Sequence, residues 1–260
     1  MAEVICSTAP FFLRPVREAF RHIADAGFTG VEVMVTRDPE TQDPVSLFAA
    51  AEEHGLRVRA VHAPFLLVAR RVWDTDPITK VRRAAEMADI LGASTVIAHL
   101  PYRWQSGYAR WLTEERPAVA AERGVTIAVE NMFSLSPLGL RGPSLHDEAP
   151  LQDAEHRVFD TSHAAVAGLD LQATAAAWGE RLAHIHLSNN RGRGWDSHLP
   201  VDEGVLDLRG FLTSLPDYTG VVSLELDLRR FMRDDRAMND VLVRNREFCT
   251  AASPTPLPLA

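Results

Sequence analysis

The stretch that decides the fold is Gly124-Val125-Thr126-Ile127-Ala128-Val129-Glu130-Asn131. It opens with a glycine that ends the helical pattern of Ala109–Glu122, and it continues as a run of apolar and β-branched residues that finishes on a glutamate. A continuous apolar run of this length is typical of a parallel strand buried on both faces. The stretch therefore contains, in order, a helix stop, a buried strand and a polar side chain at the end of that strand.

The same order repeats along the chain with a period of about 30 residues, the size of one βαβ unit. Eight strands are predicted, at Val4–Ser7, Gly30–Val35, Arg57–His62, Ser94–His99, Val125–Glu130, Arg157–Thr161, Leu182–Ser188 and Val221–Leu226. Apolar residues at helical spacing predict helices at Val16–Ala26, Val45–Glu53, Pro77–Leu91 and Ala109–Glu122, each followed by a glycine.

Eight such repeats in 260 residues favour a closed barrel over an open sheet. The sequence thus predicts an α/β protein with a single (β/α)8 TIM barrel at residues 1–250 and a flexible, proline-containing tail at 251–260. Two polar stretches interrupt the rhythm, Met132–His156, with a short helix near Ala149–Ala154, and Asn189–Gly204. Both follow strands, so both are expected at the C-terminal face of the barrel, where such enzymes bind their substrates.

Composition argues against several classes of protein. The net charge of -8 favours solubility and gives no nucleic-acid footprint, but it does not exclude nucleic acid, because a local basic patch can lie on an acidic protein. The only lysine, Lys80, lies in a helical pattern, which argues against a Schiff-base aldolase. Two cysteines, no signal-peptide pattern and no apolar stretch long enough to span a bilayer predict a cytoplasmic protein with no membrane partner.

Metal-capable side chains recur at the predicted strand ends. His62, His99 and Glu130 end the third, fourth and fifth strands, and Asp160 ends the sixth with His163 three residues later. His186 and Glu225 lie in the seventh and eighth strands. All strand C-termini of a parallel barrel meet at one face, so these side chains are expected to surround one pocket.

Burying so many ionisable groups without a cation would be very costly, which predicts a bound metal. The available ligands are nitrogen and oxygen without a thiolate, because Cys6 is interpreted as packing. Such mixed ligands suit zinc, manganese, cobalt or iron(II).

A resemblance to a known family rests on these motifs. They are Ile97-Ala98-His99, Ala128-Val129-Glu130-Asn131, Phe159-Asp160-Thr161-Ser162-His163-Ala164, His184-Ile185-His186-Leu187-Ser188-Asn189, Asp196-Ser197-His198-Leu199-Pro200 and Ser223-Leu224-Glu225. Together they resemble the xylose-isomerase-like TIM-barrel superfamily, and within it the sugar phosphate isomerase/epimerase group. The resemblance runs from about Phe28 to Arg230.

This resemblance implies one divalent metal (Mn, Zn, Co or Mg) bound by Glu130, Asp160, His186 and Glu225. It also implies that Glu130 and Glu225 are catalytic, one removing the proton next to a substrate carbonyl and the other returning it while the metal stabilises the enediolate. The expected activity is that of an isomerase or epimerase on a small sugar or polyhydroxy carbonyl compound. Barrels of this type often pair through their outer helices, so a homodimer is a further expectation.

Two alternatives stay open. A dehydratase or lyase could use the same site, because proton abstraction beside a carbonyl is a shared first step. The superfamily also includes the endonuclease IV type of abasic-site nuclease, which binds up to three zinc ions and would make nucleic acid the partner. Its nine ligands match His62, His99, Glu130, Asp160, His163, His186, Asp196, His198 and Glu225. The motifs Leu100-Pro101-Tyr102 and Met132-Phe133-Ser134 depart from the typical nuclease pattern.

Several weaker candidates complete the set. Tyr102 and Trp104 could form an aromatic wall against a sugar, and Arg193 and Trp195, with Arg191, could contact substrate from the loop after the seventh strand. His62, His99, His163, Asp196 and His198 are further metal ligands or substrate-binding groups. Asn131 and Ser188 are predicted to orient ligands. Glu32 is predicted to make a structural polar contact, His184 to pack or orient a neighbour, and His146 to have no role in the site.

Overall fold

The computed structural model describes residues 2–65, 71–133, 144–192 and 194–252, and its strands form one closed barrel in chain order. The strands are β1 (Glu3–Ser7), β2 (Gly30–Met34), β3 (Arg57–His62), β4 (Thr95–Ala98), β5 (Thr126–Glu130), β6 (Arg157–Asp160), β7 (Leu182–Leu187) and β8 (Val221–Leu224). All neighbouring pairs are parallel, including β8 with β1. The predicted (β/α)8 barrel is confirmed, and no strand end differs from its prediction by more than two residues.

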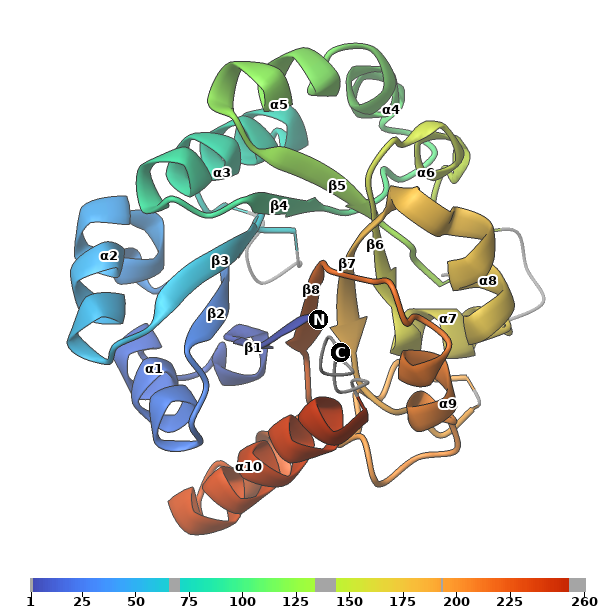
Figure 1. Cartoon of the computed structure of the whole chain (residues 1–260). Helices are drawn as coiled ribbons and strands as arrows, with labels where there is room; N and C mark the ends of the chain where they lie inside the picture. Colours follow the sequence, from blue (N-terminus) through green and yellow to red (C-terminus); the bar gives the residue numbers. More distant parts are fainter. Residues whose placement is uncertain (1, 66–70, 134–143, 193, 253–260) are drawn as a thin grey trace, which may run out of the picture.

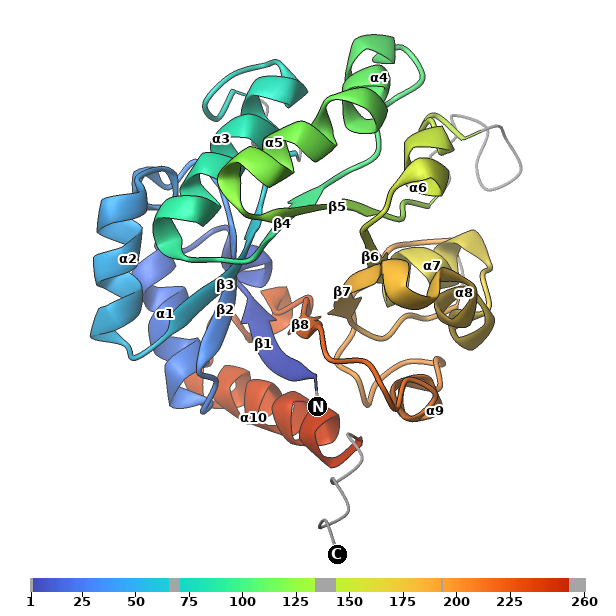
Figure 2. The same ribbon diagram turned by 45° about the horizontal axis from the view of Figure 1, so that its top comes forward.

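Helices form a ring around this barrel (Figure 1). They are α1 (Val16–Asp25), α2 (Pro44–Glu53), α3 (Pro77–Leu91), α4 (Ser106–Glu114), α5 (Arg116–Arg123), α6 (Ala149–Asp153), α7 (Thr161–Ala167), α8 (Leu171–Trp178), α9 (Leu208–Thr213) and α10 (Asp235–Ala252). Short 3-10 turns lie at Ala9–Phe11, Pro39–Gln42, Gly179–Arg181 and Arg229–Phe231. The last helix, α10, packs beside α1 and closes the ring (Figure 2). In the parts of the chain that the structure describes, no helix has both the length and the apolar character needed to cross a bilayer.

One prediction about helix bounds is wrong. The segment expected to be one helix, Ala109–Glu122, is divided between α4 and α5, with the break at Glu115. Pro117 causes the break, because proline lacks the amide hydrogen that a helix interior needs and is accepted in a first turn. The last helix, α10, ends at Ala252, close to the predicted boundary between the barrel domain and the tail. The rest of the predicted tail, residues 253–260, lies outside the described residues.

Inside the barrel, one half of the wall is apolar. Ala60, Ile97, Ala128 and Val158 form a separate buried cluster from four consecutive strands. Each of them lies two residues before a strand-end group, namely His62, His99, Glu130 and Asp160. Residues two apart on a strand point to the same face, so this layer of small and branched side chains forms the floor beneath those polar groups.

The other half of the interior is polar. Ser7, Glu32, His184 and Ser223 come from β1, β2, β7 and β8, and all four are fully buried. Ser7 Oγ donates to Glu32 Oε1 at 3.3 Å, and His184 Nε2 lies 2.8 Å from Glu32 Oε2. The barrel therefore positions the strand-end groups over a floor that is apolar on one side and polar on the other.

Candidate metal centre

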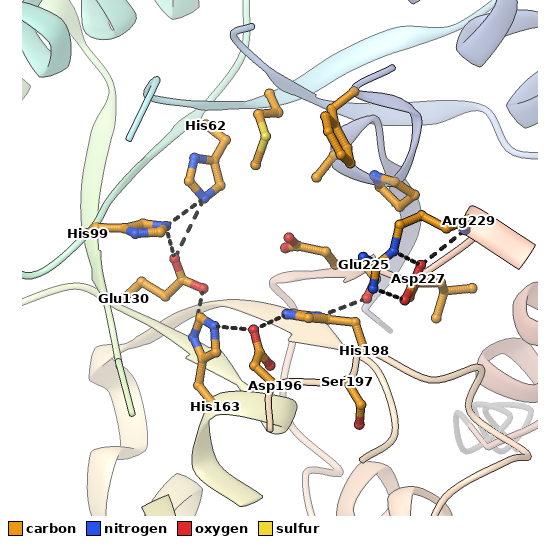
Figure 3. Close-up of a pocket in the computed structure, with 15 residues that line it drawn as sticks. His62, His99, Glu130, His163, Asp196, Ser197, His198, Glu225, Asp227 and Arg229 are labelled. Atoms are coloured by element: carbon orange, nitrogen blue, oxygen red, sulfur yellow. Dashed lines mark hydrogen bonds and ion pairs between the residues drawn. The ribbon is translucent and has the colours of Figure 1, made fainter. Parts of the chain in front are cut away.

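All nine side chains predicted as metal ligands meet in one continuous cluster at the C-terminal ends of the strands. Each of them lies within 4.0 Å of at least one other member, as an imidazole–carboxylate contact. Figure 3 shows the arc that runs from His62 and His99 through Glu130 and His163 to Asp196 and His198, with Glu225 inside it. The barrel thus brings together residues that are up to 163 positions apart in the sequence (225 − 62 = 163).

Glu130 is the centre of this cluster. Its Oε2 atom lies 3.0 Å from His99 Nε2 and 3.6 Å from His62 Nε2. Its Oε1 atom lies 3.0 Å from His186 Nδ1 and 3.5 Å from His163 Nδ1. The side chain is almost completely buried, so a cation that it binds would be screened from water and held strongly.

Asp160 is fixed by the backbone around it. Its Oδ1 atom accepts a hydrogen bond from the His163 amide at 2.7 Å and so caps α7. The Asn131 side chain accepts from the Asp160 amide at 2.7 Å and donates to the Asp160 carbonyl at 3.0 Å. Asp160 Oδ2 remains directed at His186 Nδ1, 3.8 Å away. Asn131 therefore orients this carboxylate through its main chain.

A third part of the cluster comes from the loop after β7. Asp196 Oδ2 lies 3.3 Å from His163 Nε2 and 2.8 Å from His198 Nε2. Ser162 donates to Asp196 Oδ1 at 2.6 Å, and Ser188 Oγ lies 3.1 Å from His198 Nδ1. These hydroxyl contacts hold the loop against α7 and β7.

Glu32 takes a larger part in the site than its sequence position suggested. Its Oε2 atom lies 3.1 Å from His186 Nε2, on the opposite side of the ring from the three carboxylates. His186 Nδ1 faces Glu130 Oε1 at 3.0 Å and Glu225 Oε2 at 3.1 Å. The expected structural contact of Glu32 is thus a contact with a candidate metal ligand, because β2 and β7 point these side chains into the same barrel interior.

The donor atoms fit a divalent cation. Among the described residues, the groups whose ligand atoms all lie within 4.8 Å of one another are His62–His99–Glu130, Glu130–Asp160–His186, Asp160–His163–His198 and Glu32–His184–His186. Glu225 belongs to none of these groups, although it contacts His186. Glu130 Oε2 and Asp160 Oδ2 are buried oxygens without a hydrogen-bond donor. Unsatisfied buried carboxylate oxygens beside imidazoles are what a metal with mixed nitrogen and oxygen ligands requires.

Charge coupling within the cluster shifts the protonation of its members. Burial alone would raise the pKa of Glu130, but His99 and His186 outweigh it and hold the pKa well below its usual range. Burial raises the pKa of Glu225. Burial lowers the pKa of His99 to about 4. For His198 the effect of burial is reversed, chiefly by Asp196, which raises the pKa to about 10. In the absence of a cation, protonated imidazoles balance the carboxylates, and a metal would replace those protons.

A pocket of about 220 Å³ opens above the cluster. Its walls include His62, His99, Glu130, His163, Asp196, His198 and Glu225, with Phe12, Met34 and Leu226 as apolar surfaces. Arg229 is the one arginine among its lining residues, and it is paired with Asp227 at 2.5 Å. The pocket is thus suited to a small polar molecule.

The weaker sequence candidates lie elsewhere. Trp195 is 72% exposed and is not among the residues that line this pocket. Trp104 lines a neighbouring pocket together with Tyr102. Arg193 lies outside the described residues.

Comparison with known proteins agrees with this geometry. Residues 20–246 match the model of a family described as xylose isomerase-like TIM barrel. An uncharacterized protein from Mycobacterium leprae is 32% identical over 243 residues, which cover 85% of this chain and 87% of that protein.

Solved structures of two kinds of enzyme share the fold. A D-allulose 3-epimerase from Methylomonas sp. is 19% identical with a TM-score of 0.70, and the match covers 96% of this chain and 98% of that one. A family 2 AP endonuclease from Brucella melitensis is 20% identical with a TM-score of 0.67, covering 89% and 98%. At these identities the comparison shows a shared barrel fold, and the reaction has to be argued from the residues of the site.

Proposed function

This chain belongs to the xylose isomerase-like TIM barrel family, and from that premise we propose that it is a divalent-metal-dependent isomerase or epimerase of a small sugar or polyhydroxy carbonyl compound. The observation that carries the proposal is the meeting of Glu130, Asp160 and Glu225 at His186 Nδ1, at 3.0, 3.8 and 3.1 Å. We assign these four residues as the ligands of one metal, either Mn, Zn, Co or Mg.

The chemistry requires a base and an acid on either side of one carbon. When bound, the metal polarises the carbonyl and hydroxyl oxygens of the substrate. In our assignment Glu130 and Glu225 exchange the proton next to the carbonyl, one removing it and the other returning it. His62 and His99, which line the pocket beside Glu130, bind the substrate's hydroxyl groups. A dehydratase or lyase would share the first of these steps.

The proposal also includes the cellular location, the class of ligand and the oligomeric state of the protein. The chain has two cysteines, Cys6 and Cys249, both buried, and two are too few for a disulfide framework, which supports a reducing, cytoplasmic location. The single arginine of the pocket lining is already paired with Asp227 and so is not available to bind a phosphate, which supports a small carbohydrate-like ligand. Pairing of two barrels into a homodimer remains part of the proposal, as does the extent of the barrel domain to residue 250.

The test is a deuterium wash-in experiment with a panel of ketoses, such as D-fructose, D-tagatose and D-allulose. The metal-loaded protein is expected to incorporate solvent deuterium at the carbon next to the carbonyl, detected by NMR. Glu130→Gln and Glu225→Gln are expected to lower the rate by at least about 100-fold, the contribution typical of a general base. Glu122→Gln, at an exposed position on α5, is the matched control. Exchange at the wild-type rate in Glu130→Gln would contradict the assignment.

A second candidate function is supported by one observation. Besides Glu130–Asp160–His186, the groups His62–His99–Glu130 and Asp160–His163–His198 could each hold a metal. Asp196 contacts both His163 and His198. Three zinc ions would make the site similar to that of an abasic-site nuclease. Metal analysis of the dialysed protein and an incision assay on abasic duplex DNA distinguish the two candidates. One metal per chain and no incision eliminate the nuclease.

A further inference from the structure

A second pocket lies on the same face of the barrel, next to the pocket above the candidate metal cluster, which we call the metal pocket. It has a volume of about 460 Å³, against about 220 Å³ for the metal pocket. It is formed by the loop after β3, the start of α3 and the loop after β4, through Pro64, Phe65, Thr75, Pro77, Lys80, Tyr102, Trp104 and Gln105. None of these residues takes part in the cluster of ionisable groups described above, so the reaction itself does not explain this pocket.

Phe65 connects the two pockets. Its ring centroid lies 4.3 Å from that of His99, which lines the metal pocket. On its other side it lies 6.1 Å from Tyr102, and Tyr102 lies 4.7 Å from Trp104. A continuous run of rings therefore leads from the candidate catalytic residues out to the surface, and a molecule bound at the metal could extend along it.

Trp104 is the outermost ring of this run. Its side chain is 66% exposed, yet it stacks on Tyr102 with an interplanar angle of 8°. Tyr102 in turn stacks on buried His146 at 4.9 Å and 18°. The exposed indole is thus supported by two further rings and keeps a fixed orientation, which reduces the entropic cost of binding a ligand against it.

The main chain fixes this stack from both sides. Tyr102 and His146 form an isolated antiparallel bridge, which joins the loop after β4 to the segment before α6. Arg103 donates its amide to the Leu145 carbonyl at 2.8 Å, and Asp147 donates to the Pro101 carbonyl at 2.8 Å. Gln105 Oε1 accepts from the Tyr102 amide at 2.8 Å. His146, which showed no sign of a role in the sequence, therefore supports the aromatic surface.

The lining indicates the chemistry of the ligand. Aromatic rings present a flat apolar surface, and Thr75 and Gln105 add hydroxyl and amide groups at its edge. Among the described residues of the lining, Lys80 is the one basic side chain and there is no arginine, so these residues offer a phosphate little charge to bind. A flat apolar surface with a few neutral polar groups fits the C–H face of a sugar ring and its hydroxyls.

We propose that this pocket is a second sugar subsite, and that the substrate class is a glycosylated carbonyl sugar. The carbonyl-bearing unit occupies the metal pocket, and the attached sugar ring packs against Trp104. This inference rests on the proposed function, since it assumes sugar chemistry at the metal centre. It explains why a larger pocket with a fixed aromatic wall lies beside the small reaction pocket.

The test compares D-fructose with its glucosides turanose, maltulose and isomaltulose, each of which retains the fructose carbonyl. With the metal-loaded protein, KM for deuterium wash-in is expected to be lower for at least one glucoside than for fructose, by about 3- to 10-fold. Trp104→Ala is expected to remove that preference and leave KM for fructose unchanged. Phe48→Ala, an exposed phenylalanine on α2 with 47% exposure, is the matched control and keeps the wild-type preference.

The outcomes separate the two proposals. Wash-in with fructose but equal KM values for every glucoside overturns the subsite and leaves the isomerase intact. An equal loss for fructose and the glucosides in Trp104→Ala also overturns it, because Trp104 would then act on the reaction pocket. Absence of wash-in with all the sugars defeats the isomerase, and the sugar subsite with it.

Discussion

At the scale of single residues, the contact between Glu32 and His186 determines which ring nitrogen can bind a metal. A carboxylate 3.1 Å from Nε2 favours a proton on that nitrogen and leaves Nδ1 available to the side where Glu130 and Asp160 lie. His184, 2.8 Å from the same carboxylate oxygen, holds Glu32 in place. In the proposed metal centre, Glu32 would therefore be a positioning residue for His186.

Replacing this carboxylate is expected to weaken metal binding. Glu32→Gln should lower the affinity for Mn²⁺ or Zn²⁺ by about 10- to 100-fold, the usual effect of losing the partner of a histidine ligand. Metal titration by calorimetry measures the effect, and circular dichroism verifies that the barrel is folded. Glu122→Gln, on the exposed face of α5, should retain wild-type affinity. An unchanged affinity in Glu32→Gln would mean that Glu32 only fills the barrel interior.

His22, which is not a member of the candidate metal cluster, couples stability to pH. It is buried against Phe11, and its Nε2 atom lies 3.0 Å from Arg21, 3.4 Å from Arg14 and 3.6 Å from Asp235. Burial and then Arg21 lower its pKa below the ordinary value of 6.5, while Asp235 and Asp25 oppose this shift. The folded state therefore favours the neutral ring.

The sign of the pH dependence follows from this lowered pKa. The contribution of a neutral buried histidine is complete above pH 6.5 and is lost as pH falls below that value, because the unfolded chain then binds the proton more readily. His22→Gln is expected to flatten the fall in the free energy of unfolding between pH 7.5 and about 5.5, as measured by urea denaturation in the presence of a chelator. A variant with the same slope as the wild type would show that His22 does not contribute.

The sequence predicted which side chains gather at the site because strand ends of a parallel barrel share one face. It did not predict the role of Glu32, which lies in mid-strand and whose partners are 152 and 154 residues away. The available signal was a carboxylate between valines in Gly30-Val31-Glu32-Val33-Met34, a pattern that requires a buried partner. Partners across the barrel depend on register, which a single sequence does not determine.

At the scale of elements, the strands were predictable and the helices only in part. Buried parallel strands are continuous apolar runs and stand out in any window. Helix α8 is rich in alanine, and α7 begins directly after β6, so neither offers a clear amphipathic pattern. Helix α10 does have such a pattern, with Met238, Val241, Leu242 and Cys249 buried at helical spacing, although it is not among the predicted helices.

The loop after β7 depends on a close approach at Gly204. A Cβ atom there would lie 2.6 Å from the Asn190 carbonyl oxygen and would also collide with the Asn189 side chain. Asn189 holds the loop through the Val201 carbonyl and the Leu206 amide, at 2.8 and 2.9 Å. The loop that carries Asp196 and His198 therefore requires glycine at this position.

Gly204→Ala is expected to destabilise the protein by about 1 to 3 kcal/mol, the usual cost of overpacking. It should also weaken metal binding, since Asp196 and His198 belong to the displaced loop. Gly107→Ala is the matched control, because a Cβ atom there meets nothing within 4 Å, and alanine in helix α4 should be neutral or slightly stabilising. Urea denaturation compares the two. Equal stabilities would show that the loop accommodates the methyl group.

At the scale of the whole molecule, the metal centre joins strands from most of the barrel wall. A ligand that binds only the folded state stabilises it, by about 2.7 kcal/mol at a concentration 100 times its Kd. For a protein of this size, chelation is therefore expected to lower Tm by about 5 to 10 °C. Differential scanning calorimetry with and without EDTA measures the shift, and Mn²⁺ or Zn²⁺ should restore it. In Asp160→Asn the response to EDTA should be much smaller; an identical response would place the metal elsewhere.

The bridge between Tyr102 and His146 has a consequence for redesign. In many barrels each loop at the catalytic face can be exchanged independently of the others, because each is attached only to its own strand and helix. Here the loop after β4 and the segment before α6 share a ring stack and main-chain hydrogen bonds. They form one cassette, and a graft that replaces one half while keeping the other would leave an aromatic ring with no partner to stack on.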